Sequence, residues 1–459
     1  MIYILESGLM KFASSVLARR LGGATLLGWA VLPNLTHAAT ITYANPAGAQ
    51  NFTVGANWIG GAAPGSGDFP IINGANGAVD YPFVDSAVGV QRFNIADPSA
   101  SSGGLEIRSG GTLTTSLTSA HYVGARGVGE LRILPGGTAS INGPVNVGWG
   151  DAVGRGTGTI TQTGGAYIGS SASAALNIGA VAASGILPAS VGTYNLQGGT
   201  MNIGGSVLVG QNGIGTFNVS AGSSMTATGS LVVGQAGTGI FNMNGGSITT
   251  NSFLQIGRTG AGTLTQTAGT LSANRTSGDA MVIAALAGAT GKYEISGGSL
   301  SVTSTGAAGV TNGISAGTAN ATFKIVGTGA SSISIAGDYK QYAGAGLELA
   351  IGAGITPIML TGNATLGGTL GVAFSTTPSP GQQFTVMNYG GTLTGTFSTF
   401  DSVVDSPLGP DTIGLSISYG SGSNSAVVLT VVPEPTAGVM MATVVWCGAM
   451  IRRRTTFHA

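Results

Sequence analysis

The stretch Gly215-Thr216-Phe217-Asn218-Val219 carries the pattern that decides the fold of this chain. Its apolar residues stand two positions apart with a polar residue between them, which is the period of a half-buried β-strand and not of a helix. A small residue followed two positions later by a large apolar one recurs nine times, at intervals of 23 to 34 residues. Self-similarity at such a period is typical of a stacked-repeat protein. The small residues are Gly103, Gly129, Gly158, Gly192, Gly215, Gly239, Gly262, Gly291 and Ala321.

Each repeat contains two or three short alternating runs separated by glycine-containing corners such as Val209-Gly210 and Val233-Gly234. A single coil of this kind cannot bury its apolar face, so successive coils must stack as parallel strands about 4.8 Å apart. The sequence therefore predicts an all-β fold, a parallel β-helix (β-solenoid) of about nine coils. The rules for strand crossovers favour a right-handed helix.

The outward positions between the apolar residues form a column of their own. Opposite charges fall on neighbouring coils, and three asparagines fall on consecutive coils, where ion pairs and stacked amides support the register. We therefore expect these side chains to contact one another along the stack. The column is Glu106, Arg132, Thr161, Asn195, Asn218, Asn242, Thr265, Glu294 and Lys324.

The whole-chain composition agrees with a glycine-rich β-solenoid. The 459 residues include 82 glycines without a three-residue period, which excludes collagen, and only 7% are charged. A positive mean hydropathy argues against disorder. Residues 39–432 contain 14 acidic and 10 basic residues, so the basic surface of a nucleic-acid-binding protein is absent. The single cysteine, Cys447, lies outside this range, so disulfides and Cys/His zinc sites are excluded there.

The N-terminus has the three parts of a secretory signal peptide. Lys11, Arg19 and Arg20 precede an apolar run over 21–32, and small residues follow around Ala38. We assign 1–38 to this signal; the alternative is a retained membrane anchor, but the run is short for a permanent span. Whether the chain starts at Met1 or Met10 stays open.

The C-terminus carries the most specific signal. Pro433-Glu434-Pro435 is followed by an apolar segment, 437–451, and then by Arg452, Arg453 and Arg454. About 15 apolar residues make a marginal transmembrane segment, and the arginines would hold their end in the cytoplasm. An ordinary tail anchor is the alternative interpretation.

This tail, 433–459, closely resembles the PEP-CTERM sorting signal of Gram-negative bacteria, which has the same parts in the same order. The resemblance implies export, a pause in the inner membrane through 437–451, cleavage near Pro433-Glu434-Pro435 by an exosortase, and delivery to the cell surface or an exopolysaccharide matrix. The departures are Thr436, where serine is common, and the residues 455–459 that trail the arginines.

Two segments without the fixed period flank the predicted coils, 103–336. Residues 39–102 contain the run Asn57-Trp58-Ile59-Gly60-Gly61, followed by Pro64 and Asp68, which resembles the entry segment of secreted bacterial β-strand-repeat proteins. We predict that 39–102 form an N-terminal cap, since an open solenoid end would otherwise pair with other chains. Trp58 in this segment has a second interpretation, a platform for stacking sugars. Residues 337–432 contain alternating strand patterns and the element Gly395-Thr396-Phe397. This segment resembles the β-rich closing module common before PEP-CTERM signals and at the end of autotransporter passengers, and it is predicted to cover the other end.

Few residues are suited to catalysis. His121 is the only histidine in 39–432 and is interpreted as a surface or turn residue. Glycoside cleavage needs two carboxyl groups about 5 to 10 Å apart, and the acids of the coils are expected in different columns or distant coils. Asp401, Asp405 and Asp411 are candidate oxygen ligands for Ca²⁺, with a solvated loop as the favoured alternative. The acids of the coils are Glu106, Glu130, Asp151, Asp279 and Glu294.

The sequence thus predicts an exported, non-catalytic structural or adhesive protein of the cell surface or matrix, needing no cofactor and associated with exopolysaccharide or biofilm. The alternative is a polysaccharide lyase or glycoside hydrolase on the same scaffold. That alternative predicts two acids, or an acid and a basic residue such as Arg126 or Arg155, converging with an aromatic side chain.

Overall fold

The structure, a computed structural model, describes residues 39–44, 50–74, 81–98, 101–315, 317–327, 331–401 and 414–432. These residues belong to one compact unit. The signal peptide and the sorting tail of the sequence analysis lie outside the described residues.

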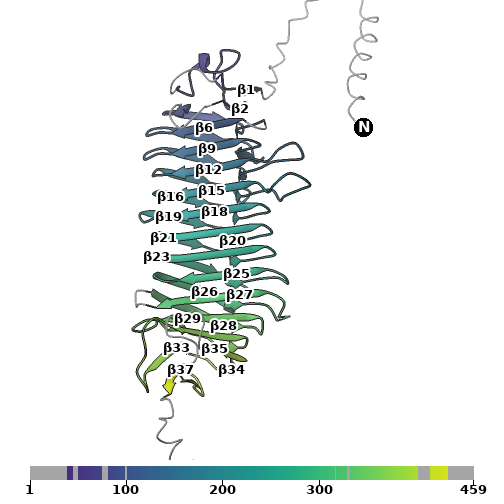
Figure 1. The fold of residues 1–459 in the computed structure, drawn as a ribbon. Coiled ribbons are helices and arrows are strands. Elements are labelled where there is room, and N and C mark those ends of the chain that lie inside the picture. The colour runs from purple at the N-terminus through teal and green to yellow at the C-terminus, as the bar shows by residue number, and fades with distance from the viewer. Residues whose placement is uncertain are drawn as a thin grey trace, which may run out of the picture. The chain divides into compact units, whose positions relative to one another are not determined.

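Parallel strands stacked coil upon coil make up almost all of this unit, so the predicted all-β solenoid is confirmed. The chain passes from a first strand ladder, face A, to a second, face B, and a third, face C, before it returns to face A one coil further on. Figure 1 shows β6, β9, β12, β15 and β18 of face A one after another along the stack.

Face A contains the strands with the glycine pattern. They are β3 (Phe83–Val84), β6 (Ser102–Ile107), β9 (Val128–Ile133), β12 (Thr157–Gln162), β15 (Val191–Leu196), β18 (Ile214–Val219), the first parts of β21 (Thr238–Thr250) and β23 (Ala261–Arg275), then β25 (Thr290–Ile295), β27 (Asn320–Gly327), β29 (Ala345–Ile351), β32 (Thr369–Phe374) and β35 (Thr399–Asp401).

Face B follows a glycine-containing turn in most coils; the exception among the described turns is Asp85-Ser86, between β3 and β4. Its strands are β4 (Ala87–Val90), β7 (Thr112–Thr115), β10 (Thr138–Ile141), β13 (Ala166–Gly169), β16 (Gly199–Ile203), β19 (Ser223–Ala227), the second parts of β21 and β23, the first parts of β26 (Gly298–Asn312) and β28 (Ser331–Gln341), then β30 (Ile358–Leu360) and β33 (Gln383–Tyr389).

Face C has the shortest strands. They are β1 (Thr40–Thr42), β2 (Phe69–Ile72), β5 (Asn94–Ile95), β8 (His121–Val123), β11 (Val145–Val147), β14 (Leu176–Ile178), β17 (Val207–Val209), β20 (Leu231–Val233), β22 (Leu254–Ile256), β24 (Met281–Ile283), the ends of β26 and β28, then β31 (Ala364–Leu366) and β34 (Leu393–Gly395).

The described residues make about 13 turns, somewhat more than the about nine coils that were predicted from the glycine pattern. Parallel pairing extends on both sides of 103–336, from β1 with β2 at one end to β32 with β35 at the other. The additional coils keep the strand pairing but lack the glycine pattern from which the coils were counted. The handedness and the domain boundaries stay predictions.

Matching residues of successive coils lie over one another. Phe217 of β18 is the register partner of Phe241 of β21, and their rings stack with centroids 5.0 Å apart. Tyr194 of β15 stacks on Phe217 at the same spacing. The side chains of these three residues are fully buried, which confirms that the pattern residues form an interior ladder.

Two glutamines allow tyrosine hydroxyls to enter this apolar interior. Gln266 accepts a hydrogen bond from Tyr293 Oη at 2.7 Å, and its Nε2 donates to the carbonyls of Gly269 and Ser299 at 3.1 and 3.0 Å. Gln162 makes the same contact with Tyr194, again at 2.7 Å. Since a buried hydroxyl without a partner is costly, each tyrosine depends on the glutamine of the preceding coil.

Different structural elements lie near the two ends of the stack. Near the first coils, a 3-10 turn, η2 (Gly55–Asn57), leads to Trp58, which is 2% exposed, packs on Phe52 at 4.7 Å and donates from Nε1 to the Phe52 carbonyl at 2.8 Å. A ring so buried offers no face for stacking a sugar. At the other end β36 (Gly414–Tyr419) and β37 (Ser425–Val432) form an antiparallel hairpin, and β37 also pairs with β33.

No helix in the described part of the chain is long and apolar enough to cross a membrane. The predicted transmembrane segment, 437–451, is not among the described residues.

Candidate functional site

The outward asparagines of face A form the predicted amide ladder. Asn218 donates from Nδ2 to Oδ1 of Asn195 at 2.8 Å, and Asn242 donates to Asn218 at the same distance. The amides of Asn218 and Asn242 are therefore each held in one orientation by the coil before them. The result is a fixed row of polar groups across three neighbouring coils.

Charged residues pair with one another at the two ends of the predicted face A column, Glu106 to Lys324, as expected. Arg132 lies 3.4 Å from Glu106 and Lys324 lies 3.9 Å from Glu294 on the neighbouring coil. Arg132 also contacts Glu130 of its own strand at 2.8 Å. Glu106 and Glu130 stand in different columns, as predicted. They nevertheless meet at one arginine, because a diagonal step between adjacent coils is short enough for the guanidinium to reach both.

Face B presents two outward columns over ten consecutive coils, and every residue in them is exposed or half-buried. Fifteen of these twenty described positions are serine or threonine, and no charged residue occurs among them. The first column is Ala87, Thr112, Thr138, Ala166, Thr200, Ser224, Ser247, Thr270, Ser299 and Ser332, and the second is Gly89, Thr114, Ser140, Ile168, Asn202, Thr226, Thr249, Ser272, Ser301 and Ser334. The face is therefore a periodic, uncharged array of hydroxyl groups.

Tyr81 lies over the charged group formed by Glu106, Glu130 and Arg132 on face A. Its hydroxyl donates to Glu130 at 2.7 Å, and the Arg132 guanidinium lies 4.6 Å from the ring centroid. Burial, and after it the hydrogen bond to Glu130, raises the pKa of Tyr81 to about 12. A catalytic base works best with a pKa near the operating pH, so this phenol is unsuited to abstracting a proton from a sugar.

Arg126 joins two carboxylates at the corner between faces C and A. Its guanidinium lies 2.9 Å from Asp97 and 2.8 Å from Asp151. Trp149 lies beside it, with the Arg126 Cζ 6.0 Å from the ring centroid, and Tyr122 packs on Trp149 at 4.8 Å. Two carboxylates, the basic residue Arg126 and aromatic rings therefore converge here. This is the arrangement that the enzyme alternative predicts for Arg126.

The carboxylate of Asp151 is held in its ionised form. Its Oδ1 accepts hydrogen bonds from the backbone N–H groups of Val153 and Gly154, at 2.9 and 3.4 Å. The bond from Val153 is the largest cause that lowers the pKa of Asp151, and Arg126 lowers it further. Because a glycosidase acid must stay protonated until it protonates the leaving oxygen, Asp151 is suited to binding and not to acid catalysis.

Arg155 makes no comparable cluster. Its guanidinium donates to the backbone carbonyls of Asp151 and Ala182, the latter at 3.3 Å. Its role is to fix the loop that follows Trp149.

His121 is buried on the inner side of face C, so its interpretation as a surface or turn residue is wrong. Its ring stacks on Phe93 with centroids 5.1 Å apart, and Nε2 lies 3.3 Å from Thr115 Oγ1. In β8 the outer residue is Tyr122, which forces His121 and Val123 inward. Burial, and next the positive charge of Arg92, lowers the pKa of His121 to about 4.

The candidate Ca²⁺ ligands stay untested. Asp401 ends β35, whereas Asp405 and Asp411 lie outside the described residues. Within the described ranges, no three His, Cys, Asp or Glu side chains are grouped in a way that could hold a metal ion.

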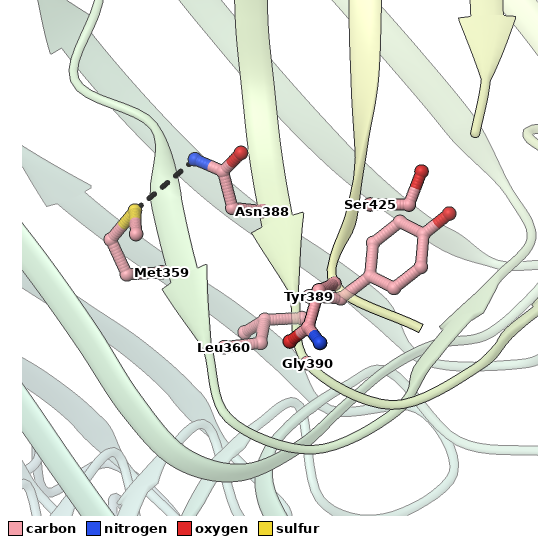
Figure 2. Close-up of a pocket in the computed structure, with 7 residues that line it drawn as sticks. Met359, Leu360, Asn388, Tyr389, Gly390 and Ser425 are labelled. Carbon is pink, nitrogen blue, oxygen red and sulfur yellow. Dashed lines mark hydrogen bonds between the residues drawn. The ribbon is translucent and has the colours of Figure 1, made fainter. Parts of the chain in front are cut away.

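A pocket of about 320 Å³ lies where the final hairpin joins the last coils. Figure 2 shows Asn388 pointing toward the sulfur of Met359, to which its Nδ2 donates at 3.2 Å, with Tyr389 beside Ser425. Tyr389 donates to the Gly420 carbonyl at 2.7 Å. The lining contains no carboxylate, imidazole or cation, so it supplies no acid–base pair. The pocket is lined by Met359, Leu360, Asn388, Tyr389, Gly390, Asn424 and Ser425.

Comparisons with protein-family models, with curated proteins and with solved structures find no match to this chain.

Proposed function

We propose that this chain is an exported structural and adhesive protein of the cell surface or extracellular matrix, associated with exopolysaccharide. The observation that carries the proposal is face B, of which ten consecutive coils present an uncharged, periodic array of hydroxyl groups. Neutral polysaccharides are themselves uncharged arrays of hydroxyls along an extended chain. A surface of repeating hydrogen-bond donors and acceptors can therefore contact a repeating ligand at many points.

The array is suited to retention by many weak contacts. A single exposed hydroxyl gains little from replacing water by a sugar hydroxyl, because its hydrogen bonds to water and to the sugar are similar in free energy. Linked contacts raise the overall affinity well above that of each one, provided the geometry allows them together. The stacked coils supply this geometry, since equivalent hydroxyls repeat about every 4.8 Å. The amide ladder of face A adds a second row of fixed polar groups.

Delivery to the surface rests on the resemblance of the two termini to export and sorting signals. In this proposal an exosortase processes the tail at Pro433-Glu434-Pro435, and 437–451 with Arg452, Arg453 and Arg454 holds the chain in the inner membrane beforehand. The charge and composition of 39–432 suit a protein that needs no nucleic-acid partner.

An enzyme acting on polysaccharide is the second candidate, and the convergence of Arg126, Asp97 and Asp151 with Trp149 favours it. Its acid–base chemistry is poorly supplied: the pKa of Asp151 is lowered and that of Tyr81 is raised, each away from the value that proton transfer at neutral pH requires.

The two candidates are separated by incubating the full chain with soluble exopolysaccharide from a Gram-negative culture. The proposal expects the protein to co-sediment with the polysaccharide while the content of reducing ends and unsaturated sugars stays constant. New reducing ends or unsaturated sugars that disappear in the Asp97→Asn/Asp151→Asn variant would establish the enzyme instead. Absence of co-sedimentation with any exopolysaccharide would contradict the adhesive function.

A further inference from the structure

Face C begins with a column of planar polar side chains that differs from the rest of the solenoid surface. Asn94, Tyr122, Asn146 and Asn177 are register partners on four successive coils. They alternate with the inward residues of face C; Tyr122 is half-buried, and the three asparagines are covered to 7 or 8% exposure. Asn177 donates from Nδ2 to Asn146 Oδ1 at 2.8 Å. Further along the same column the outward residues are the aliphatic Leu208 and Val232. The next residue in the column is Gln255. The first four coils therefore carry an unbroken run of amides and an aromatic ring.

The corner that borders this column contributes an aromatic ring and a charge network. Trp149 packs on Tyr122 at 4.8 Å with the ring planes 51° apart. Its backbone is fixed, because its N–H donates to the Gly124 carbonyl at 2.9 Å and its own carbonyl accepts from Gly156 at 2.5 Å. Arg126 then spans Asp97 and Asp151, as described above. We call the surface formed by Asn94, Asp97, Tyr122, Arg126, Asn146, Trp149 and Asp151 the Tyr122–Trp149 platform.

Three amide oxygens in the column are buried without a partner, those of Asn94, Asn177 and, further along, Gln255. Of these, Asn94 belongs to the platform. Asn94 is 7% exposed and Asn177 is 8% exposed, and the Oδ1 atom of each has no hydrogen-bond donor among the described residues. Asn94 uses its Nδ2 to donate to Asp97 at 3.1 Å, so its orientation is set by the network and its acceptor is left over. A buried acceptor without a donor is costly, and a ligand hydroxyl supplies the missing donor.

We propose that the Tyr122–Trp149 platform binds a neutral pyranose unit of a polysaccharide. A pyranose ring offers an apolar C–H face, which packs on an aromatic ring, and hydroxyls around its edge, which suit amide and carboxylate groups. Trp149 is half-buried and held in place, so it supplies the ring at little cost in side-chain freedom. This inference rests on the proposed function and deepens it, because it locates one stronger subsite within a surface of weak contacts.

The charges of the platform select a neutral sugar. The guanidinium of Arg126 is already engaged by Asp97 and Asp151, so it is not free to pair with a uronate. An acidic sugar would instead approach two carboxylates and be repelled by them. A polysaccharide rich in uronates therefore binds less well at this place than a neutral one.

The test measures retention of the full chain in native gels that contain a soluble neutral polysaccharide (dextran, galactomannan or xyloglucan) or the uronate polymer alginate. For at least one neutral polymer, Trp149→Ala is expected to lower the affinity about tenfold or more, with Trp149→Phe retaining part of it. The matched control is Phe253→Ala, since Phe253 is also half-buried and packs against an arginine, Arg275, at 5.1 Å, but four coils from the platform. This control is expected to bind as the wild type does.

A second readout does not depend on the stability of the alanine variant. The chain has four tryptophans, so the difference between the emission of the wild type and of Trp149→Phe isolates Trp149. Adding the neutral polymer is expected to shift this difference spectrum to the blue and to protect it from acrylamide, whereas alginate leaves it unchanged. Equal retention of wild type and Trp149→Ala, with an unchanged difference spectrum, would overturn the platform and leave the adhesive function standing. Failure of the wild type to be retained by any polymer would overturn both.

Discussion

Gly239→Ala is expected to destabilise the solenoid by about 3 kcal/mol or more. Gly239 stands at the recurring small position of face A. A Cβ added there would lie well inside contact distance of the backbone nitrogen of Gly234 and the backbone carbonyl of Val209. These atoms belong to the corners through which the chain leaves face C, so they cannot move aside as the end of a flexible side chain does.

The control is Gly346→Ala in β29 of the same face. Nothing lies within 4 Å of a Cβ built on Gly346, and its φ is not in the left-handed region. We expect the free energy of unfolding of this variant to lie within about 1 kcal/mol of the wild-type value. A slight gain in stability is expected, because alanine loses less backbone freedom than glycine when a strand forms. Chemical denaturation of the two variants tests the pair. Equal midpoints would show that the glycine pattern does not reflect close packing of the corners.

Acidification from pH 6.5 toward pH 4 is expected to remove about 2 to 3 kcal/mol of stability through His121 alone. The pKa of His121 is lowered to about 4 in the folded chain, against about 6.5 when unfolded. Between these values the unfolded state binds the proton and the folded state does not. The contribution of His121 is therefore complete above pH 6.5 and is lost as the pH falls toward 4.

The measurement is the free energy of unfolding in denaturant at pH 7.0 and pH 4.5, for the wild type and for His121→Gln. Glutamine keeps a polar group beside Thr115 but takes up no proton. Carboxylates titrate alike in both proteins, so the difference between the two pH responses isolates the imidazole. A parallel pH response in wild type and variant would contradict the buried, neutral state of His121.

The face A column could be predicted from the sequence because its position is marked twice. The period of two decides which residues point outward, and the glycine pattern sets the alignment of one coil on the next. The contacts of Asn218 with Asn195 and of Arg132 with Glu106 follow from these two facts alone. Where the glycine pattern stops, as in the first and last coils, strand pairing continues but its alignment cannot be read, so the coils there were not counted.

The Arg126 cluster could not be assembled from the sequence. Its members come from corners and loops of three coils, and the loop after Trp149 has no counterpart of equal length in its neighbours. Arg126 was named as a candidate, yet its partners Asp97 and Asp151 depend on how the loops close. Strand β8 shows the same limit on a smaller scale, since three residues are too few to tell whether His121 or Tyr122 points inward.

The proposals for face B and for the Tyr122–Trp149 platform both require that equivalent residues of successive coils stack in register. This stacking must hold whatever the length of the loops that join the coils. Spin labels on cysteines at Thr161 and Lys324, with Cys447→Ser, test this directly. The two positions lie six coils apart in the face A column, through Asn195, Asn218, Asn242, Thr265 and Glu294. Pulsed electron paramagnetic resonance should give a separation of about 29 Å, six times the spacing of strands. A separation above about 40 Å or below about 20 Å would contradict the stacked solenoid.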